Sequence, residues 1–467
     1  MLKANVLNDP QRPHLGLGRR VGYALGDFGC NFSWSLIGSY LMIFMTDVAL
    51  ISPALVGTMM LFSKALDAII DPTIGSWADH TKSKMGRYRP WILFSSIPML
   101  IFNVLCFTTF PNASNGVRTV WAIFTYICLV ILYSFVNVTY SAMPAALTRS
   151  DEDRSGLSSA RMTGAFLSMT IISFLTLRVV NWAGQGDMGK GYQSAAIIFS
   201  LVALPCFLLC VASTKEVVPF EGNQKIDYKK MLAALKGNKP VWMIIGAFVA
   251  WGIMQTGSSM RIYYFTYVVG DAVLFANVST IQSIAGMLGT LSLTWLIKRF
   301  GNKGRICMCG FLLGAVGNTI NFFLPTTTAS GMYAYYCVTI FNGFATGLIL
   351  ASLFGMNPDT TEYTAYHYGV HNMAGFISAF VNFAFQAGTS LAGAASGWIL
   401  AGAGYAANQA QNSSVLFILN FFSHIFVAIT MLVAAFFMSR YKLDKEMYAD
   451  ICEKLERGEY APGVTAK

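Results

Sequence analysis

Asp67 and Asp71 are the residues whose type and spacing most directly suggest chemistry. They lie in the largely apolar stretch ALDAIIDPTIGSWAD, four residues apart, so on a helix they share one face. A single aspartate at the centre of a membrane helix costs about 2.5–3.5 kcal/mol to insert, so two of them need an explanation. Two carboxylates on one face can bind Na⁺ through oxygen ligands or can bind a proton. The alternative is a structural ion pair with Lys64 or Arg161.

A second polar set lies in other apolar stretches of the first half of the chain. An aromatic ring can cover the C–H face of a sugar, while amides, carboxylates and guanidinium groups bind its hydroxyls. Each aromatic taken alone is better explained by packing, but the set together favours a sugar site. Its members, several of them at helical spacing, are Asp27, Asn31, Trp34, Tyr133, Ser134, Asn137, Tyr140 and Arg161.

The second half of the chain is polar in a milder way, so the chemistry is concentrated in the first half. The polar residues within its apolar stretches are Gln255, Arg261, Tyr263, Tyr264, Asn382 and Gln386.

The elements that position these residues must be membrane helices. The chain is 55% hydrophobic and 12% charged, whereas soluble proteins are about 25% charged. Apolar runs of about 20 residues, the length of a spanning helix, recur along nearly the whole chain. We therefore expect an all-α membrane protein with twelve spans, near 20–46, 52–79, 90–110, 117–146, 160–182, 194–213, 241–268, 277–297, 304–325, 331–356, 372–402 and 414–438.

The basic residues indicate the orientation of these spans. Most of the 32 Lys and Arg residues fall in the termini and in alternate connections, which the positive-inside rule assigns to the cytoplasm. Both termini are then cytoplasmic, as in a protein of a plasma or bacterial inner membrane. The net charge of +10 is explained by this topology, and no nucleic-acid partner is expected.

A long basic connection divides the spans into two groups of six. Each group has a basic turn after its second span, DHTKSKMGRYRP in the first and KRFGNKGR in the second, which is weak internal symmetry of the kind found in transporters. The segment DYKKMLAALKGNK within the connection predicts a short interfacial helix. The expected domains are bundles at 1–213 and 241–440, a cytoplasmic middle loop at 214–240 and a cytoplasmic tail at 441–467.

Enzyme motifs are missing from the sequence. It has no P-loop, H-E-x-x-H or G-x-S-x-G, and its nine cysteines include no C-x-x-C pair. We therefore expect neither an enzyme nor a bound cofactor, and a metal at Asp67 and Asp71 only if the ion bound there is Na⁺.

Several stretches resemble the glycoside–pentoside–hexuronide:cation symporters, a branch of the major facilitator superfamily. They are GYALGDFGCNF, YLMIFMTDV, YYFTYVVGDAVLF, NPDTTEY and the long segment LVGTMMLFSKALDAIIDPTIGSWADHTKSKMGRYRPWIL. The resemblance covers essentially the whole chain. It implies twelve helices in two six-helix bundles that work by alternating access, driven by Na⁺, H⁺ or Li⁺.

The resemblance also implies roles for individual residues. Asp67 and Asp71 match the family's cation-binding carboxylates, and Ser134 matches a hydroxyl that assists them. Tyr133 matches an aromatic residue of the sugar site, and Arg161 matches its arginine.

Departures from the family pattern concern the substrate and the ion. Asn137 stands where a melibiose-transporting member has a sugar-binding carboxylate, and Cys30 and Asn31 replace a lysine–aspartate pair. Ser141 replaces a tryptophan, and Gln386 lies near a position where lysine is usual. Fewer charges around the sugar site argue against melibiose itself, and both Na⁺ and H⁺ stay open as the coupling ion.

The sequence thus predicts a secondary transporter that couples a monovalent cation to a glycoside, pentoside or hexuronide. The expected cation site is Asp67, Asp71 and Ser134. Two alternatives are a cation-coupled lysolipid transporter and a membrane sugar sensor that does not transport. The expected substrate-binding residues are Asp27, Asn31, Tyr133, Asn137, Arg161 and Gln386.

Overall fold

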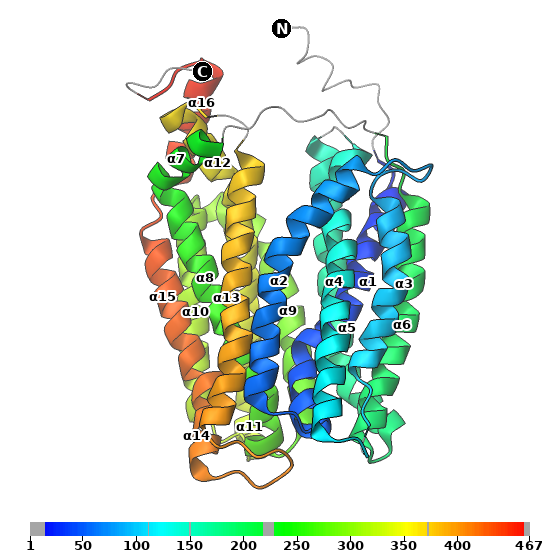
Figure 1. Cartoon of the computed structure of the whole chain (residues 1–467). Helices are drawn as coiled ribbons and strands as arrows, with labels where there is room; N and C mark the ends of the chain where they lie inside the picture. The colour runs from blue at the N-terminus through cyan, green and yellow to red at the C-terminus, as the bar shows by residue number, and fades with distance from the viewer. Residues whose placement is uncertain (1–14, 111, 149–150, 218–227, 371–372, 462–467) are drawn as a thin grey trace. The chain divides into compact units, whose positions relative to one another are not determined.

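The computed structural model describes residues 15–110, 112–148, 151–217, 228–370 and 373–461. Within these ranges the chain is helical and contains no strand (Figure 1). The helices are α1 (Leu17–Ile43), α2 (Pro53–His80), α3 (Arg89–Cys106), α4 (Asn115–Leu147), α5 (Asp151–Gly184), α6 (Met188–Ser213), α7 (Tyr228–Gly237), α8 (Lys239–Tyr263), α9 (Ala272–Phe300), α10 (Lys303–Phe323), α11 (Ala329–Gly355), α12 (Asn357–Tyr368), α13 (Ala374–Gly402), α14 (Ser413–Ser423), α15 (Ile425–Ser439) and α16 (Lys445–Glu456). Two π-helical turns, η1 (Phe44–Val48) and η2 (Tyr264–Val269), extend α1 and α8.

Long apolar helices occur at every predicted span. In the described part of the chain, eleven helices are long and apolar enough to cross a membrane. The eleventh predicted span, 372–402, corresponds to α13, which has 29 residues; Asn382 and Gln386 interrupt its apolar sequence, and it is not among these eleven helices. The predicted all-α fold is therefore confirmed.

Two helices differ from the expectation in detail. The last predicted span, 414–438, consists of α14 and α15, which are separated at His424. The NPDTTEY segment forms its own short helix, α12. The predicted helix in the middle connection is present as α7, whereas residues 218–227 of that connection lie outside the described residues.

Contacts within the chain define two compact units. One comprises Met1–Gly222 with Ala406–Gln409, and the other Asn223–Tyr405 with Ala410–Lys467. In the first unit α1 packs on α5 and α6, and α4 packs on α2 and α3; in the second, α8 packs on α13 and α15, and α11 packs on α9 and α10. The assignment of each loop to one side of the membrane stays a prediction, and so do the domain boundaries proposed at 213, 240 and 440.

Polar residues fix the beginnings of several helices. The side chains of Ser114, Asn238, Asn302 and Asn412 each accept a hydrogen bond from the backbone N–H three residues ahead. Such caps satisfy donors that the first helical turn leaves free. The capping residues therefore specify, from the sequence nearby, where these helices begin.

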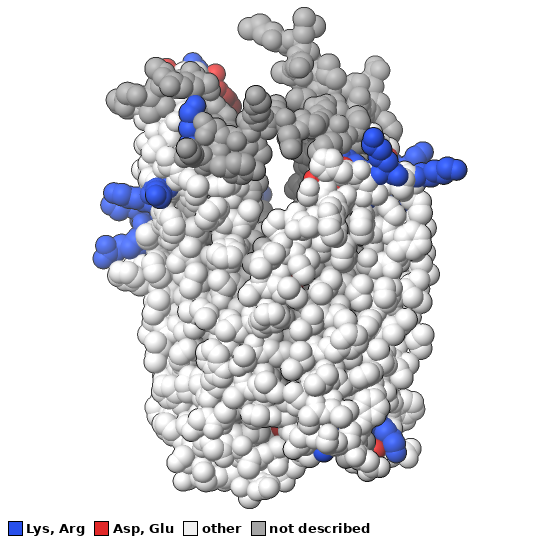
Figure 2. Space-filling view, viewed as in Figure 1, with Lys and Arg blue, Asp and Glu red and all other residues white. Residues whose placement is uncertain are grey.

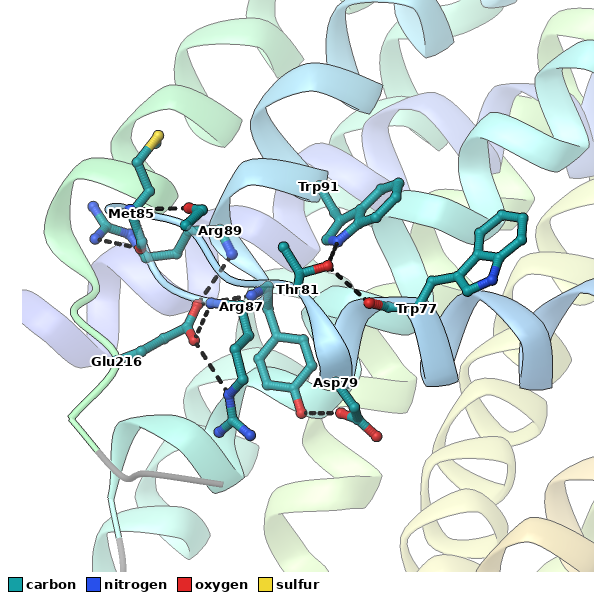
Figure 3. A network of polar contacts seen from close by, with 10 residues as sticks. Trp77, Asp79, Thr81, Met85, Arg87, Arg89, Trp91 and Glu216 are labelled. Atoms are coloured by element: carbon teal, nitrogen blue, oxygen red, sulfur yellow. Dashed lines mark hydrogen bonds and ion pairs between the residues drawn. The ribbon is translucent and has the colours of Figure 1, made fainter. Parts of the chain in front are cut away.

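The basic turn between α2 and α3 is held by Glu216, which follows α6 (Figure 3). Its carboxylate accepts hydrogen bonds from the backbone N–H groups of Arg87, Tyr88 and Arg89 at 2.7, 2.9 and 3.1 Å. Carboxylates stabilise helix N-termini in this way because they meet unpaired N–H groups and the positive end of the helix dipole. Glu216 therefore supplies, from elsewhere in the chain, the cap that the start of α3 lacks.

The cationic side chains are unevenly distributed on the surface. On the face drawn in Figure 2, most Lys and Arg side chains lie toward one end of the helices, and the long flanks are mostly uncharged. An uncharged flank is what a helix surface in contact with lipid requires.

Candidate functional site

The polar residues predicted from the first half of the chain form two connected groups in the first unit. One group surrounds Asp67 and Asp71 on α2, and the other surrounds Asp27 on α1 and Arg161 on α5. Helix α4 contributes to both groups, because it packs against α2 and also contacts α1 and α5.

Asp67 is the better-buried carboxylate of the α2 pair, with 6% of its surface exposed. One of its oxygens accepts a hydrogen bond from Ser134 Oγ at 3.2 Å, and the other is 2.9 Å from Lys64 Nζ. The sequence analysis considered Lys64 as a structural partner for this pair, and the structure contains that ion pair. Because Ser134 comes from α4, Asp67 also joins α2 to α4.

Asp71 lies one helical turn beyond Asp67 and is half-buried. Its Oδ1 atom is buried and has no hydrogen-bond partner among the described residues. Ser134 acts on the carboxylate as a hydrogen-bonding group, whereas Lys64 and Asp67 act on it electrostatically. A buried carboxylate oxygen without a donor is unfavourable. Asp71 is therefore the member of the pair with an oxygen available to a cation.

Asp27 and Arg161 form the second ion pair. Arg161 Nε donates to Asp27 Oδ1 at 3.0 Å, and Asn31 Nδ2 donates to the other carboxylate oxygen at 3.1 Å. Arg161 also donates to Ser141 Oγ at 3.3 Å, and its guanidinium lies 5.3 Å from the centre of the Tyr140 ring. This group presents charged and amide donors around one buried carboxylate.

An aromatic pair connects the two groups. The rings of Trp34 and Tyr133 stack with centroids 4.2 Å apart, and Lys64 Nζ lies 5.1 Å from the Trp34 ring centre. Tyr133 precedes Ser134 in α4 and is an electrostatic neighbour of Asp27, Arg161 and Asp67. The aromatic surface and both ion pairs therefore lie around the same short segment of α4.

Two predicted site residues are less closely tied to these groups. Asn137 is half-buried on α4 and makes no side-chain hydrogen bond with the described residues. Gln386 lies on α13 in the second unit, where its side chain is exposed. Their assignment to the substrate site stays a prediction.

The sequence analysis counted Trp34 in the set that favours a sugar site, but it assigned no site role to Lys64 or Ser141, although the contacts of both join the assigned residues. The position of Lys64, three residues before Asp67, is visible in the sequence because residues three apart are neighbours on a helix. The contact of Ser141 with Arg161 depends on how α4 and α5 pack, which spacing does not specify.

Comparison with known proteins identifies the family to which this chain belongs. Residues 22–445 match the family model described as MFS/sugar transport protein. The isoprimeverose transporter of Lactiplantibacillus pentosus is 36% identical over 93% of this chain and 91% of its own length. The putative glycoside/cation symporter YagG of Escherichia coli is 31% identical over 84% of both chains.

A solved structure agrees on the fold. The crystal structure of a D-xylose–proton symporter superposes with a TM-score of 0.64, covering 92% of this chain and 98% of the other, at 13% sequence identity. At that identity the likeness concerns the fold alone. Together with the family match, it confirms the major facilitator fold and the resemblance to the glycoside–pentoside–hexuronide:cation symporters. The chain is therefore an integral membrane protein of the MFS/sugar transport family, a family of transporters rather than enzymes.

Proposed function

We propose that this protein is a secondary symporter that moves a glycoside, pentoside or hexuronide into the cell together with a monovalent cation, Na⁺ or H⁺. The observation that carries the proposal is the position of Tyr133 and Ser134. Ser134 hydrogen-bonds the Asp67 carboxylate, while the adjacent Tyr133 stacks on Trp34. One segment of α4 thus joins the carboxylate pair to the aromatic surface, so occupancy of one affects the other.

In this mechanism the cation binds at Asp71, Asp67 and Ser134. Its charge competes with Lys64 for Asp67, so Lys64 and the adjacent Trp34 move relative to Tyr133 when the cation binds. The sugar ring stacks against these aromatics, and its hydroxyls bind Asp27, Asn31, Asn137 and Arg161. Binding of either ligand then favours the arrangement that binds the other, which is the reciprocity that coupled transport requires.

The driving force is sufficient for accumulation. One charge crossing a potential of about 100 mV releases about 2.3 kcal/mol. Because 1.4 kcal/mol corresponds to about tenfold in concentration, this amounts to about 40-fold accumulation of a neutral sugar. An advantage of this size explains why two costly carboxylates are kept in the membrane.

The test is ion movement in de-energised cells that express the protein, followed with external pH and Na⁺ electrodes. A panel of glycosides, pentosides and uronic acids is added one at a time. Alkalinisation on addition of one sugar identifies H⁺ as the partner, and loss of external Na⁺ identifies sodium.

Asp67→Asn and Asp71→Asn are each expected to abolish the ion signal and the accumulation. Asp187→Asn is the control, because Asp187 is an exposed aspartate at the start of α6. Concentrative uptake that keeps its ion dependence in both α2 variants would refute the proposed cation site. Absence of any ion or sugar movement, with expression verified, would refute the symport function.

A further inference from the structure

A small polar cavity lies in the second unit, lined by residues of α8, α9, α10, α11 and α15. It has room for about one or two particles the size of water. Its polar lining includes Arg261, Gln282, Asn318, Asn321 and Asn342. None of these residues belongs to the cation or sugar sites proposed above.

The three asparagines are buried, and the side-chain oxygen of each has no hydrogen-bond partner among the described residues. Asn318, Asn321 and Asn342 expose 3%, 2% and 7% of their surfaces. The Oδ1 atom of each, and Nε of Arg261, is buried and has no hydrogen-bond partner among the described residues. Buried polar atoms are nearly always hydrogen-bonded, so four such atoms around one cavity indicate a polar ligand.

Arg261 is a positive charge without a compensating acid. Helices α8–α11 and α13–α15 contain no Asp or Glu, and Arg261 forms no ion pair among the described residues. Its Nη1 atom donates a hydrogen bond to the neutral Gln282 Oε1 at 2.9 Å. Arg161 in the first unit, by contrast, pairs with Asp27 at 3.0 Å. A cation in a membrane helix is unfavourable unless it is paired or hydrated.

The groups around Arg261 leave its charge uncompensated. Arg261 acts electrostatically on Tyr335 and His424, which hydrogen-bond each other through Tyr335 Oη and His424 Nε2 at 3.0 Å. Neither side chain carries a negative charge near neutral pH. Among the described residues of this unit, therefore, no side chain that faces Arg261 compensates its charge.

We propose that this cavity binds a small monovalent anion that pairs with the Arg261 guanidinium. Arg261 Nε is an available donor. Asn342 also lines the cavity, and its side-chain amide group is a second possible donor to the ligand. Asn318 is held differently, since its Nδ2 donates to the Gly314 carbonyl at 2.8 Å; its Oδ1 accepts from a water that accompanies the anion.

A free halide such as chloride matches the small size of the cavity, whereas a sugar acid such as glucuronate is larger than the one or two water-sized particles that the cavity can hold. The salts that stabilise the protein should therefore differ by anion size, and the effect should depend on Arg261.

The experiment measures the thermal unfolding midpoint of the purified full-length protein in detergent without an ion gradient. Sodium chloride, bromide, glucuronate and a bulky organic sulfonate are compared at equal concentration; the last two anions are too large for the cavity. An anion at about 100 times its Kd is expected to raise Tm by about 3 °C. The variants are Arg261→Gln, the charge-conserving Arg261→Lys and the control Arg178→Gln, which changes a half-buried arginine of the first unit that stacks on Phe174.

A rise with chloride and bromide that is lost in Arg261→Gln and kept in Arg178→Gln supports a halide site. A rise with glucuronate alone overturns the proposal, because glucuronate is too large for the cavity. Equal Tm values in all four salts, or shifts that persist in Arg261→Gln, overturn the proposal.

A second measurement covers the case in which Arg261→Gln does not fold. Crystals of the unmodified protein grown in bromide are expected to show an anomalous peak beside Arg261, and the absence of that peak overturns a halide site. Because neither measurement depends on transport, failure here is distinguishable from failure of the symport proposal.

Discussion

Lys64 and Asp67 form an ion pair within one turn of α2, with Nζ 2.9 Å from Oδ2. The other oxygen of Asp67 accepts from Ser134, so both oxygens of this carboxylate have partners. Asp71, one turn further along the helix, retains a buried oxygen without a hydrogen-bond donor among the described residues. A cation that enters this site can therefore bind Asp71 directly but must compete with Lys64 for Asp67.

Lys64→Gln is expected to strengthen cation binding. Removal of this competing, partly solvent-exposed ammonium group makes the free energy of cation binding more favourable by up to about 1 kcal/mol. This corresponds to about fivefold in affinity. The measurement is the half-saturating Na⁺ concentration, or the pH midpoint, of sugar uptake.

Lys190→Gln provides a matched control, because Lys190 also pairs with an aspartate three residues away, Asp187, but at an exposed site. It should leave the cation dependence unchanged. A half-saturating concentration that is unchanged or higher in Lys64→Gln would contradict competition at Asp67.

Separate removal of Arg161 and Asp27 is expected to destabilise the first unit. Loss of one partner leaves the other charge poorly compensated, which lowers the free energy of unfolding by about 2–4 kcal/mol. We expect the low end of this range because Arg161 exposes one third of its side chain. The double variant Asp27→Asn with Arg161→Gln should be more stable than the sum of the single effects predicts.

A double-mutant cycle of thermal stability checks this coupling, and substrate binding to each variant checks the site assignment. Additive losses would show that the two side chains do not interact in solution. Unchanged substrate affinity in all three variants would remove the pair from the substrate site.

Gly86→Ala is expected to disrupt the turn that Glu216 holds. Gly86 has φ of +109°, and an added β-carbon would lie 2.6 Å from the Glu216 carboxyl carbon. Backbone strain of this kind costs about 1–3 kcal/mol, and displacement of Glu216 removes hydrogen bonds to the start of α3 in addition.

Gly301→Ala separates the two contributions, since Gly301 has φ of +70° but nothing within 4 Å of the added carbon. Thermal unfolding of both variants is compared with that of Glu216→Gln. Equal losses for the two glycine variants would mean that contact with Glu216 contributes nothing.

Gly347→Ala is expected to separate α9 from α11. An added β-carbon would lie 1.9 Å from the Gly286 carbonyl oxygen, so the helix backbones must move apart, at a cost of about 1–3 kcal/mol. Gly355→Ala in the same helix meets nothing within 4 Å and should be neutral or slightly stabilising, because alanine favours helix. Equal unfolding midpoints of the two variants would contradict close backbone packing.

Asp187 gives a prediction about pH. Hydrogen bonds from Lys190, first from its backbone N–H, lower the pKa of the Asp187 carboxyl below its usual 3.8. The carboxylate therefore stabilises the start of α6 above pH 3.8, and this contribution is lost as the pH falls through the lowered pKa. The difference in thermal stability between the protein and Asp187→Asn should be constant from pH 7 to about pH 5 and diminish below pH 4; a constant difference throughout would refute the assignment.

The sequence by itself determined the helices and the residues worth testing. Apolar runs of spanning length fix the membrane fold because every backbone polar group in lipid must be bonded within a helix. Asp67 and Asp71 were identifiable because costly charges in apolar segments stand out, and their common face follows from helical periodicity. The ion pair of Lys64 with Asp67 could be expected from the sequence as well, because the two residues are three apart on one helix.

Tertiary structure decided which separate segments meet. The contact between Asp27 and Arg161 joins residues 134 positions apart, and Glu216 reaches the α2–α3 turn from beyond α6. The cavity beside Arg261 depends on five helices that pack together. Helical periodicity gives the face on which a side chain lies, but not the neighbouring helix that the face meets, because that choice is set by the packing of whole surfaces.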